Sequence, residues 1–385
     1  MQTKVLYYDS ICLLDFEANI LQIEEKDGEY YVVLDQTAFY PDSGGMCCDI
    51  GLIDNIEVVR VIKYHDEIVH VLKEEPTNTK VKCHVDEYTR KTNIQIHDAQ
   101  HLLTAILEKD YDLITISHHV HGNYCDLVVS GPELTSEILY EVERFANECI
   151  IENRRLDIQM VRKADLAKFG LEDNPKYTDP VRLTNIEGLN DNNACGCLHF
   201  ETLGPIQAIK CLGVEKTGKN FKILFTSGLK MINFFDTYND IVKELKILTK
   251  GNEDTVISKV KEIQTKNINL TKELNETKSK CYELQLDNFV NDNIIIFEGP
   301  DNNFDDLRTV GHLVVNGDRD IYGLLQMKKD DKYQFILVKQ KDSSYSLEDL
   351  FNKLKTELNV QGGGKGLMIN GQSSVDLTKE IKKYL

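Results

Sequence analysis

The chain has 385 residues, a hydrophobic fraction of 41% and a formal charge of −18, so we expect two or three domains rather than one core. The negative charge excludes a generic binder of polyanions, because backbone phosphates require lysine and arginine. No apolar run reaches the roughly 18 residues of a membrane span and no signal peptide is recognisable, so we expect a cytoplasmic protein with reduced cysteines and no membrane contact.

Residues 1–88 are predicted to be rich in strands. The stretches YYVVLDQTAFY and IEVVRVIKYHDEIVHVLK alternate β-branched and aromatic residues with polar ones, and KDGEY supplies a hairpin turn. His65, His70 and His84 alternate with apolar strand residues, so we expect all three imidazoles to face solvent.

From Asp86 to Lys109 the pattern changes to a helical period, which carries His97 and His101 on one face. The predicted strands YCDLVVS, IQAIKCLGVEK and NFKILFTSG then alternate with a helix at about 136–153. Residues 89–230 are therefore predicted to form an α+β domain.

Residues 231–291 are polar and helical, with two apolar stripes separated by KGNED. The stripes favour a helical hairpin or a short coiled coil. Polar Asn267 and Thr277 interrupt the second stripe, so the pattern leaves open whether the segment is a spacer or a dimerising coil.

Residues 292–385 form the last predicted unit. NIIIFEG, IYGLLQMKK and YQFILVKQK are predicted strands, and SLEDLFNKLKTEL is a capped amphipathic helix followed by NVQGGGKGLMINGQ. We expect a short sheet with one or two helices.

Two pairs of metal-binding residue types are separated by about a hundred residues. His97 and His101 share a helix face, while Cys195 and His199 stand four apart in ACGCLHF. Three imidazoles and one thiolate form a set of nitrogen and sulfur ligands that suits Zn²⁺. The alternative is that the histidines are ordinary polar residues and that Cys195 and Cys197 are small buried ones.

Another histidine cluster, His118, His119 and His121, is denser but less suited to a single metal site. Neighbouring residues of a strand point to opposite faces. We therefore expect these three side chains to line a pocket instead.

The motifs resemble those of a known family, the editing domain of alanyl-tRNA synthetases and its free-standing AlaX relatives. TAFYPDSGGMCCDIG resembles TxFYPxxGGQxxDxG, HDAQHLL resembles HxxxHLL, and CGCLH resembles CGGTH. The helical spacer and VQGGGKG resemble the C-terminal domain of alanyl-tRNA synthetases. The resemblance covers almost the whole chain, in the layout of a long-form AlaX.

The resemblance implies trans-editing, the hydrolysis of the ester that joins a wrong amino acid to alanine tRNA, with serine first and glycine second. An alanine pocket excludes neither the smaller glycine nor an analogue that only adds a hydroxyl, so a second hydrolytic site must sort the products. Zn²⁺ on His97, His101, Cys195 and His199 would orient the substrate while nearby water attacks.

Other site residues follow from the same resemblance. Thr37 would read the serine hydroxyl, and Gly44 and Gly45 would bring backbone N–H groups close to the ester. Met46 follows them on the substrate side. The tRNA-facing loop would consist of Gly362, Gly363, Gly364 and Lys365.

Three positions depart from the family pattern. Met46 stands where the family has glutamine, Cys197-Leu198 where it has Gly-Thr, and Lys222 where many relatives have arginine. Because these changes thin the polar shell of the site, two alternatives stay open: a non-catalytic tRNA-binding relative, and a metal-dependent hydrolase of another small ester or amide.

The sequence therefore predicts an α+β protein in four parts. These are a β-barrel-like N-terminal domain (1–88), a zinc-binding editing domain (89–230), a coiled-coil-like spacer (231–291) and a small α/β domain for tRNA binding or dimerisation (292–385). The expected partner is tRNA(Ala), and a homodimer through the spacer and the last domain stays open.

Overall fold

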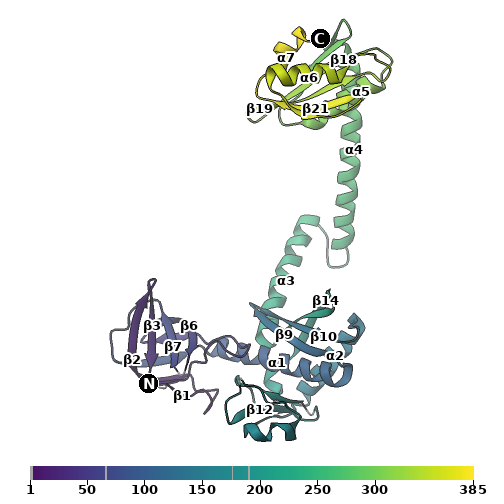
Figure 1. Cartoon of the computed structure of the whole chain (residues 1–385). Helices are drawn as coiled ribbons and strands as arrows, with labels where there is room; N and C mark the ends of the chain where they lie inside the picture. The colour runs from purple at the N-terminus through teal and green to yellow at the C-terminus, as the bar shows by residue number, and fades with distance from the viewer. Residues whose placement is uncertain (1–2, 66, 176, 190) are drawn as a thin grey trace. The chain divides into compact units, whose positions relative to one another are not determined.

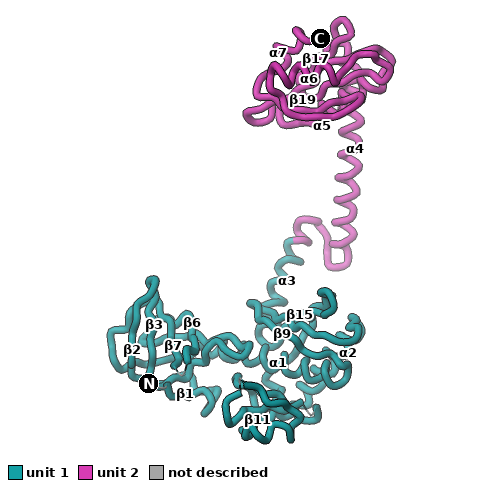
Figure 2. Tube along the Cα trace, in the orientation of Figure 1, with its two compact units in different colours: residues 1–244 teal, residues 245–385 magenta. Residues whose placement is uncertain are grey.

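The computed structural model describes residues 3–65, 67–175, 177–189 and 191–385 (Figure 1). The chain divides into two compact units, residues 1–244 and 245–385 (Figure 2). Helices and several sheets are both present, which confirms the α+β class. The finer division into four domains stays a prediction. Within the described ranges, no helix combines the length and the apolar character needed to cross a membrane.

The N-terminal strands close into a six-stranded barrel in the order β2-β3-β7-β6-β5-β8, which confirms the predicted β-rich, barrel-like start. The turn between the first two of these strands contains Asp27 and Gly28 at φ 53° and 81°, as expected for a tight hairpin. The strands of this region are β1 (Lys4–Val5), β2 (Asp15–Lys26), β3 (Glu29–Leu34), β4 (Gln36–Thr37), β5 (Gly51–Ile53), β6 (Ile56–Tyr64), β7 (Glu67–Leu72) and β8 (Lys80–Val85).

One histidine of the barrel contradicts the prediction that it faces solvent. His70 is fully buried; its Nδ1 lies 3.1 Å from the carbonyl oxygen of Val32 and its Nε2 lies 2.8 Å from Oγ1 of Thr37. The prediction was wrong because His70 shares the inward face of β7 with apolar neighbours two residues away. His65 and His84 are exposed as predicted.

Helix α1 (Glu87–Tyr111) follows the barrel and is buried along most of its length. It begins after Asp86, whose side chain accepts a hydrogen bond from the N–H of Thr89, and ends at Asp112 in the left-handed conformation. Buried Arg90 ties the helix to the barrel through an ion pair with Asp49 of the glycine-rich motif, at 2.6 Å. The predicted helix is therefore confirmed.

Much of the rest of the first unit packs with α1 in a large apolar core, and a smaller cluster forms around Leu166. A four-stranded sheet has the order β14-β15-β10-β9, and a three-stranded sheet has the order β11-β12-β13. The elements are β9 (Ile114–His121), β10 (Tyr124–Ser130), α2 (Ser136–Ile151), β11 (Leu156–Val161), η1 (Lys163–Phe169), β12 (Val181–Ile186), β13 (Asp191–Ala194), η2 (Gly204–Ile206), β14 (Ile209–Thr217) and β15 (Asn220–Ser227).

The predicted helical segment consists of α3 (Gly228–Thr249) and α4 (Val256–Phe289), with the break at the predicted place. The apolar stripe of α4 is exposed in the single chain, at Ile263, Leu270, Leu274 and Leu284. The described chain therefore leaves this stripe uncovered, and the dimer stays a prediction.

The C-terminal sheet has six strands in the order β16-β17-β18-β19-β21-β20, and it contains the three predicted strands. The predicted cap is also confirmed, because Ser346 accepts a hydrogen bond from the N–H of Asp349 at the start of α6. The elements are β16 (Val290–Asn291), β17 (Ile294–Glu298), α5 (Phe304–Asn316), β18 (Tyr322–Lys329), β19 (Lys332–Lys339), α6 (Leu347–Leu358), β20 (Gln361–Gly363), β21 (Met368–Ser373), α7 (Leu377–Glu380) and η3 (Ile381–Lys383).

Candidate metal centre

Four side chains from two distant segments meet at one point. His97 and His101 lie one turn apart on α1, and Cys195 and His199 lie in the turn that follows β13. Their ligand atoms all lie within 4.8 Å of one another, and Nε2 of His97 is 3.3 Å from Sγ of Cys195. We call these four residues the metal cluster and residues 195–199 the ligand turn.

The chemistry of the metal cluster fits a divalent ion. The three imidazoles are buried, and burial lowers the pKa of His97 and of His199 to about 3 and that of His101 well below its usual value. Neutral imidazoles are the form that binds metals. Nε2 of His199 is buried without a hydrogen-bond partner in the described chain. These residues can therefore hold a metal, and histidine nitrogen and cysteine sulfur are both ligand types that zinc takes.

Asp98 supports the metal cluster from behind and was missed by the sequence analysis. Its Oδ1 lies 2.5 Å from Nδ1 of His199, and its Oδ2 accepts a hydrogen bond from the N–H of Phe200 at 3.0 Å. Donation from Nδ1 to this carboxylate leaves Nε2 free for a metal. The signal was available, since an aspartate stands beside the first histidine of HDAQH.

The ligand turn is held by its backbone carbonyls. Arg182 of β12 donates Nη1 hydrogen bonds to the oxygens of Cys195 (3.0 Å) and Cys197 (2.6 Å), and the hydroxyl of Tyr8 donates to the oxygen of Gly196 at 2.6 Å. The Arg182 guanidinium also lies over the Tyr8 ring. No spacing rule connects residues so far apart along the chain, so the sequence analysis could not identify these supports.

Of the two predicted glycines, Gly44 lies against the ligand turn and Gly45 lies against His118 of β9. Gly44 and Gly45 adopt φ 64° and 84°, values that L-residues rarely take. The thiol of Cys197 contacts the carbonyl oxygen of Gly44 at 3.4 Å, and Nε2 of His118 lies 3.2 Å from that of Gly45. We call residues 43–46 the glycine turn. The glycine turn contributes no ligand to the metal cluster and is connected to it through the contacts with Cys197 and His118.

Three of the residues that depart from the family pattern share one apolar cluster. Met46, Cys197 and Leu198 are all buried. They pack together with the other members of the cluster, Tyr7, Tyr40 and Ile94. These three departures are therefore adjacent in space.

Thr37 lies at the end of β4, which pairs with β1 outside the closed barrel, and is fully buried. Its hydroxyl contacts Nε2 of His70 at 2.8 Å and accepts a hydrogen bond from the N–H of Phe39 at 3.1 Å. The first contact reaches β7 of the barrel and the second lies within the segment that follows β4. The reading of a serine hydroxyl by Thr37 stays a prediction.

The histidines of β9 face different partners, as strand alternation requires. His118 faces the glycine turn. His119 and His121 each lie 3.4 Å from Oδ1 of buried Asp126, whose Oδ2 pairs with Lys222 at 3.2 Å. Only His118 is thus directed at the candidate site.

The predicted tRNA-facing residues lie in the second unit. Gly362 and Gly363 belong to β20, which pairs with β21, and Gly364 and Lys365 follow in an exposed connection. A hollow of about 630 Å³ beside Gly362 is lined by amide side chains and by Phe304 and Arg308. The contact of this loop with tRNA stays a prediction.

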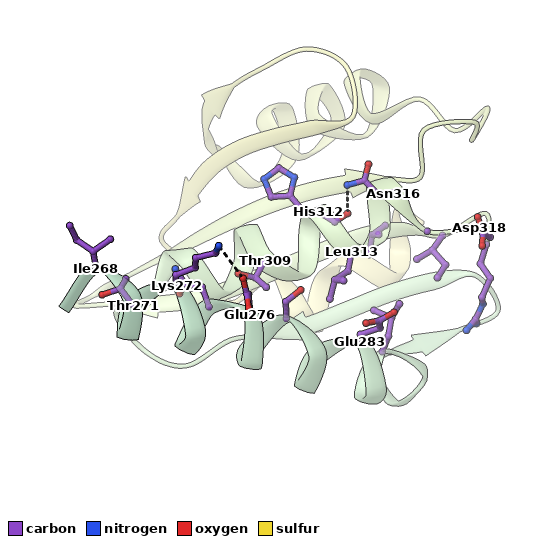
Figure 3. Close-up of a pocket in the computed structure, with 17 residues that line it drawn as sticks. Ile268, Thr271, Lys272, Glu276, Glu283, Thr309, His312, Leu313, Asn316 and Asp318 are labelled. Atoms are coloured by element: carbon purple, nitrogen blue, oxygen red, sulfur yellow. Dashed lines mark hydrogen bonds and ion pairs between the residues drawn. The ribbon is translucent and has the colours of Figure 1, made fainter. Parts of the chain in front are cut away.

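Another hollow, of about 1010 Å³, lies between α4 and α5 (Figure 3). Two charged residues of its lining pair with each other, with Lys272 lying 3.8 Å from Glu276. Thr309 and His312 of α5 complete the same lining. This hollow is lined by none of the site residues predicted from the sequence. It is therefore not the candidate site, although it is the larger of the two hollows described.

Comparison with known proteins agrees with the motifs. Residues 2–89 match the family model described as tRNA synthetases class II (A). Alanyl-tRNA editing protein Aarsd1 of Bos taurus is 29% identical over 274 residues, which cover 66% of this chain and 61% of the relative. Aarsd1-A of Xenopus laevis is 30% identical over 260 residues, covering 64% and 62%.

An archaeal protein gives a similar alignment. Alanyl-tRNA editing protein AlaX-L of Pyrococcus horikoshii is 31% identical over 250 residues, covering 62% of this chain and 61% of the relative. The chain thus spans about three fifths of the length of these relatives. Residues 2–89 are thus similar to the class II (A) tRNA synthetases, and about two thirds of the chain is similar to the alanyl-tRNA editing proteins Aarsd1 and AlaX-L.

Proposed function

We propose that this chain is a zinc-dependent aminoacyl-tRNA deacylase that acts in trans on mischarged tRNA(Ala). The observation that carries the proposal is the metal cluster, with four ligand atoms within 4.8 Å, beside a glycine turn at positive φ. The printed names of the relatives, alanyl-tRNA editing proteins, support the same substrate class.

Each part of the site has a chemical task in this proposal. Bound Zn²⁺ would orient the amino and carbonyl groups of the ester. The glycine turn brings backbone N–H groups where they can stabilise the oxyanion, and Asp98 fixes the ring of His199. Thr37 is proposed to distinguish serine from alanine, because a donor or acceptor left unpaired by alanine costs free energy.

The partner surface is proposed to lie in the second unit. Lys365 and the glycines at 362–364 allow close approach of a phosphate backbone. The exposed apolar stripe of α4 supports a homodimer, because such a stripe gains stability when a second helix covers it.

A second candidate function has its own supporting observation. Met46, Cys197 and Leu198 form part of a buried apolar cluster, whereas the family pattern has the polar groups of glutamine and threonine at the first and last of these positions. A tRNA-binding relative without turnover would retain the fold and the metal but lack these groups. A hydrolase of another small ester or amide would retain the metal chemistry and lack affinity for tRNA.

A single-turnover assay with Ser-tRNA(Ala) and Gly-tRNA(Ala) separates the three functions. The proposal predicts hydrolysis by the wild-type protein, loss of hydrolysis in His101→Ala, and retention in the control His84→Ala, which changes an exposed histidine of β8. Tight tRNA binding without hydrolysis would support the second function. Zinc binding without tRNA binding would support the third and contradict the proposal.

A further inference from the structure

Every backbone carbonyl at the bend of the glycine turn has a partner. The oxygen of Ser43 accepts a hydrogen bond from the N–H three residues on, at 3.1 Å. The oxygen of Gly44 contacts the Cys197 thiol at 3.4 Å, and that of Gly45 contacts Nε2 of His118 at 3.2 Å. The half-buried imidazole of His118 and the buried thiol of Cys197 thus contact consecutive carbonyl oxygens of the same turn.

Gly44 and Gly45 lie so close to the side chains of Cys197 and His118 that no Cβ can be added without a collision. A Cβ on Gly44 would lie 2.7 Å from Sγ of Cys197, and a Cβ on Gly45 would lie 2.0 Å from Nε2 of His118. Both distances are shorter than nonbonded contact allows. The close fit means that the side chains of Cys197 and His118 restrict where the turn can lie.

Gripping the carbonyls also fixes the N–H groups. In a trans peptide, the carbonyl and the N–H point in opposite directions, so partners on the carbonyls of Ser43 and Gly44 set the directions of the N–H groups of Gly44 and Gly45. Neither of these two N–H groups has a hydrogen-bond acceptor among the described residues. They are the free donors of the turn.

We propose that Cys197 and His118 are positioning residues that hold the glycine turn from two sides, so that the N–H groups of Gly44 and Gly45 are ready for the oxyanion of the substrate ester. Cys197 acts on the Gly45 N–H through the Gly44 carbonyl. His118 acts through the Gly45 carbonyl on the Met46 N–H, which bonds the Ser43 carbonyl and so sets the Gly44 N–H. Cys197 belongs to the ligand turn and His118 to β9, so the clamp sets the glycine turn relative to the metal cluster. This inference rests on the proposed function for its chemistry, but not for its structural part.

The geometry of His118 provides a matched set of variants. Nε2 of glutamine is the same number of bonds from Cα as Nε2 of histidine, so His118→Gln retains a donor at the required reach. His118→Asn is one bond shorter and His118→Ala has no donor. The control is His119→Ala, which changes the neighbouring histidine that faces Asp126.

Two readouts are measured on the full-length protein loaded with zinc. Amide hydrogen exchange of a peptide that contains residues 43–46 reports the turn through the N–H groups of Ser43 and Met46, each of which bonds the carbonyl oxygen of the other. Steady-state deacylation gives kcat and KM. Metal content is measured for every variant, because a positioning role leaves it unchanged.

We expect faster exchange in the glycine turn for His118→Ala, His118→Asn and Cys197→Ala, with wild-type exchange in His119→Ala and near wild-type exchange in His118→Gln. The expected loss in kcat is roughly 10- to 100-fold, because displacing an oxyanion donor costs less than removing it. KM should stay the same, since the clamp acts on the transition state.

Unchanged exchange of the turn in His118→Ala and Cys197→Ala would overturn the inference. So would equal losses of kcat in His118→Gln and His118→Ala, because the hydrogen bond would then have no role. If exchange changes as expected but the wild-type protein hydrolyses no aminoacyl-tRNA, the clamp stands and the proposed function fails. The two failures are therefore distinguishable.

Discussion

Oδ1 of Asp98 lies 2.5 Å from Nδ1 of His199, so the residue that follows one metal ligand orients another ligand a hundred positions away. The contact is buried, with both side chains inaccessible to solvent. It fixes the ring and directs the free Nε2 of His199 into the metal cluster.

We expect Asp98→Asn to weaken zinc binding roughly 10- to 100-fold, as loss of a carboxylate partner of a ligating histidine commonly does. Asparagine has one acceptor oxygen, whereas His199 and the N–H of Phe200 use both oxygens of Asp98. Competition with a chelator measures the affinity. Asp110→Asn, at the exposed end of α1, is the control, and equal affinities in the two variants would contradict the role of Asp98.

Gly45→Ala should disrupt the turn beyond the cost of its backbone conformation. Gly28 provides the matched control, since it has φ 81° but no atom within 4 Å of an added Cβ. Gly28→Ala should therefore lower the free energy of unfolding by only ~1–2 kcal/mol, the cost of alanine in a left-handed conformation. Gly45→Ala should lower the free energy of unfolding, measured in urea, by more than this, because its Cβ would collide with His118.

The collision can be tested by a double variant. Combining Gly45→Ala with His118→Ala removes the ring that the new Cβ would meet, so the two losses of unfolding free energy should not add. Strictly additive losses would show that the ring of His118 does not press on Gly45.

Met46→Gln should destabilise the protein. Met46 is 1% exposed in an apolar cluster, and a buried amide without partners costs about 1–3 kcal/mol. Urea unfolding measures the loss. Restoring the neighbours as well, in the triple variant with Cys197→Gly and Leu198→Thr, should recover part of it because space and hydroxyl partners return. A large gain in deacylation rate with Met46→Gln alone would contradict the apolar closure of the site.

The stability of the barrel should fall in acid because of His70. Burial lowers the pKa of His70 to about 4 from an ordinary value of 6.5, so the unfolded chain binds a proton at this ring before the folded chain does. The stability from the neutral ring is fully present above pH 6.5 and is lost as the pH falls towards 4, by about 3 kcal/mol in total.

The matched variant for this effect is His70→Gln, which keeps an amide near Thr37 and does not titrate. Its unfolding free energy should fall less steeply between pH 6.5 and 4 than that of the wild-type protein. The difference between the two curves isolates His70 from the buried histidines of the metal cluster. Parallel curves would show that His70 does not contribute.

Local patterns predicted much of the fold. The alternation in the first ninety residues predicted the barrel strands, and the helical period around His97 predicted α1, because both signals depend on neighbours along the chain. The pairing of His97 and His101 with Cys195 and His199 was also predicted, from residue types that suit one metal.

The supports of the site were not predicted, because they depend on contacts between distant segments. Tyr8 and Arg182 hold the ligand turn across 188 and 13 to 15 positions, and no periodicity connects them. His70 was misjudged because a strand that closes a barrel carries apolar residues on either side of the histidine. His118 differed from His119 only in strand phase, which the sequence alone leaves open.

The central claim is that the metal cluster binds one divalent ion through three histidines and Cys195. Titration of the metal-free protein with Co²⁺ tests it directly, because a thiolate ligand gives a sulfur-to-cobalt charge-transfer band that nitrogen and oxygen ligands do not. We expect one ion per chain with this band, its loss in Cys195→Ser and its retention in Cys197→Ser. Absence of stoichiometric binding, or a band that depends on Cys197 instead of Cys195, would contradict the account.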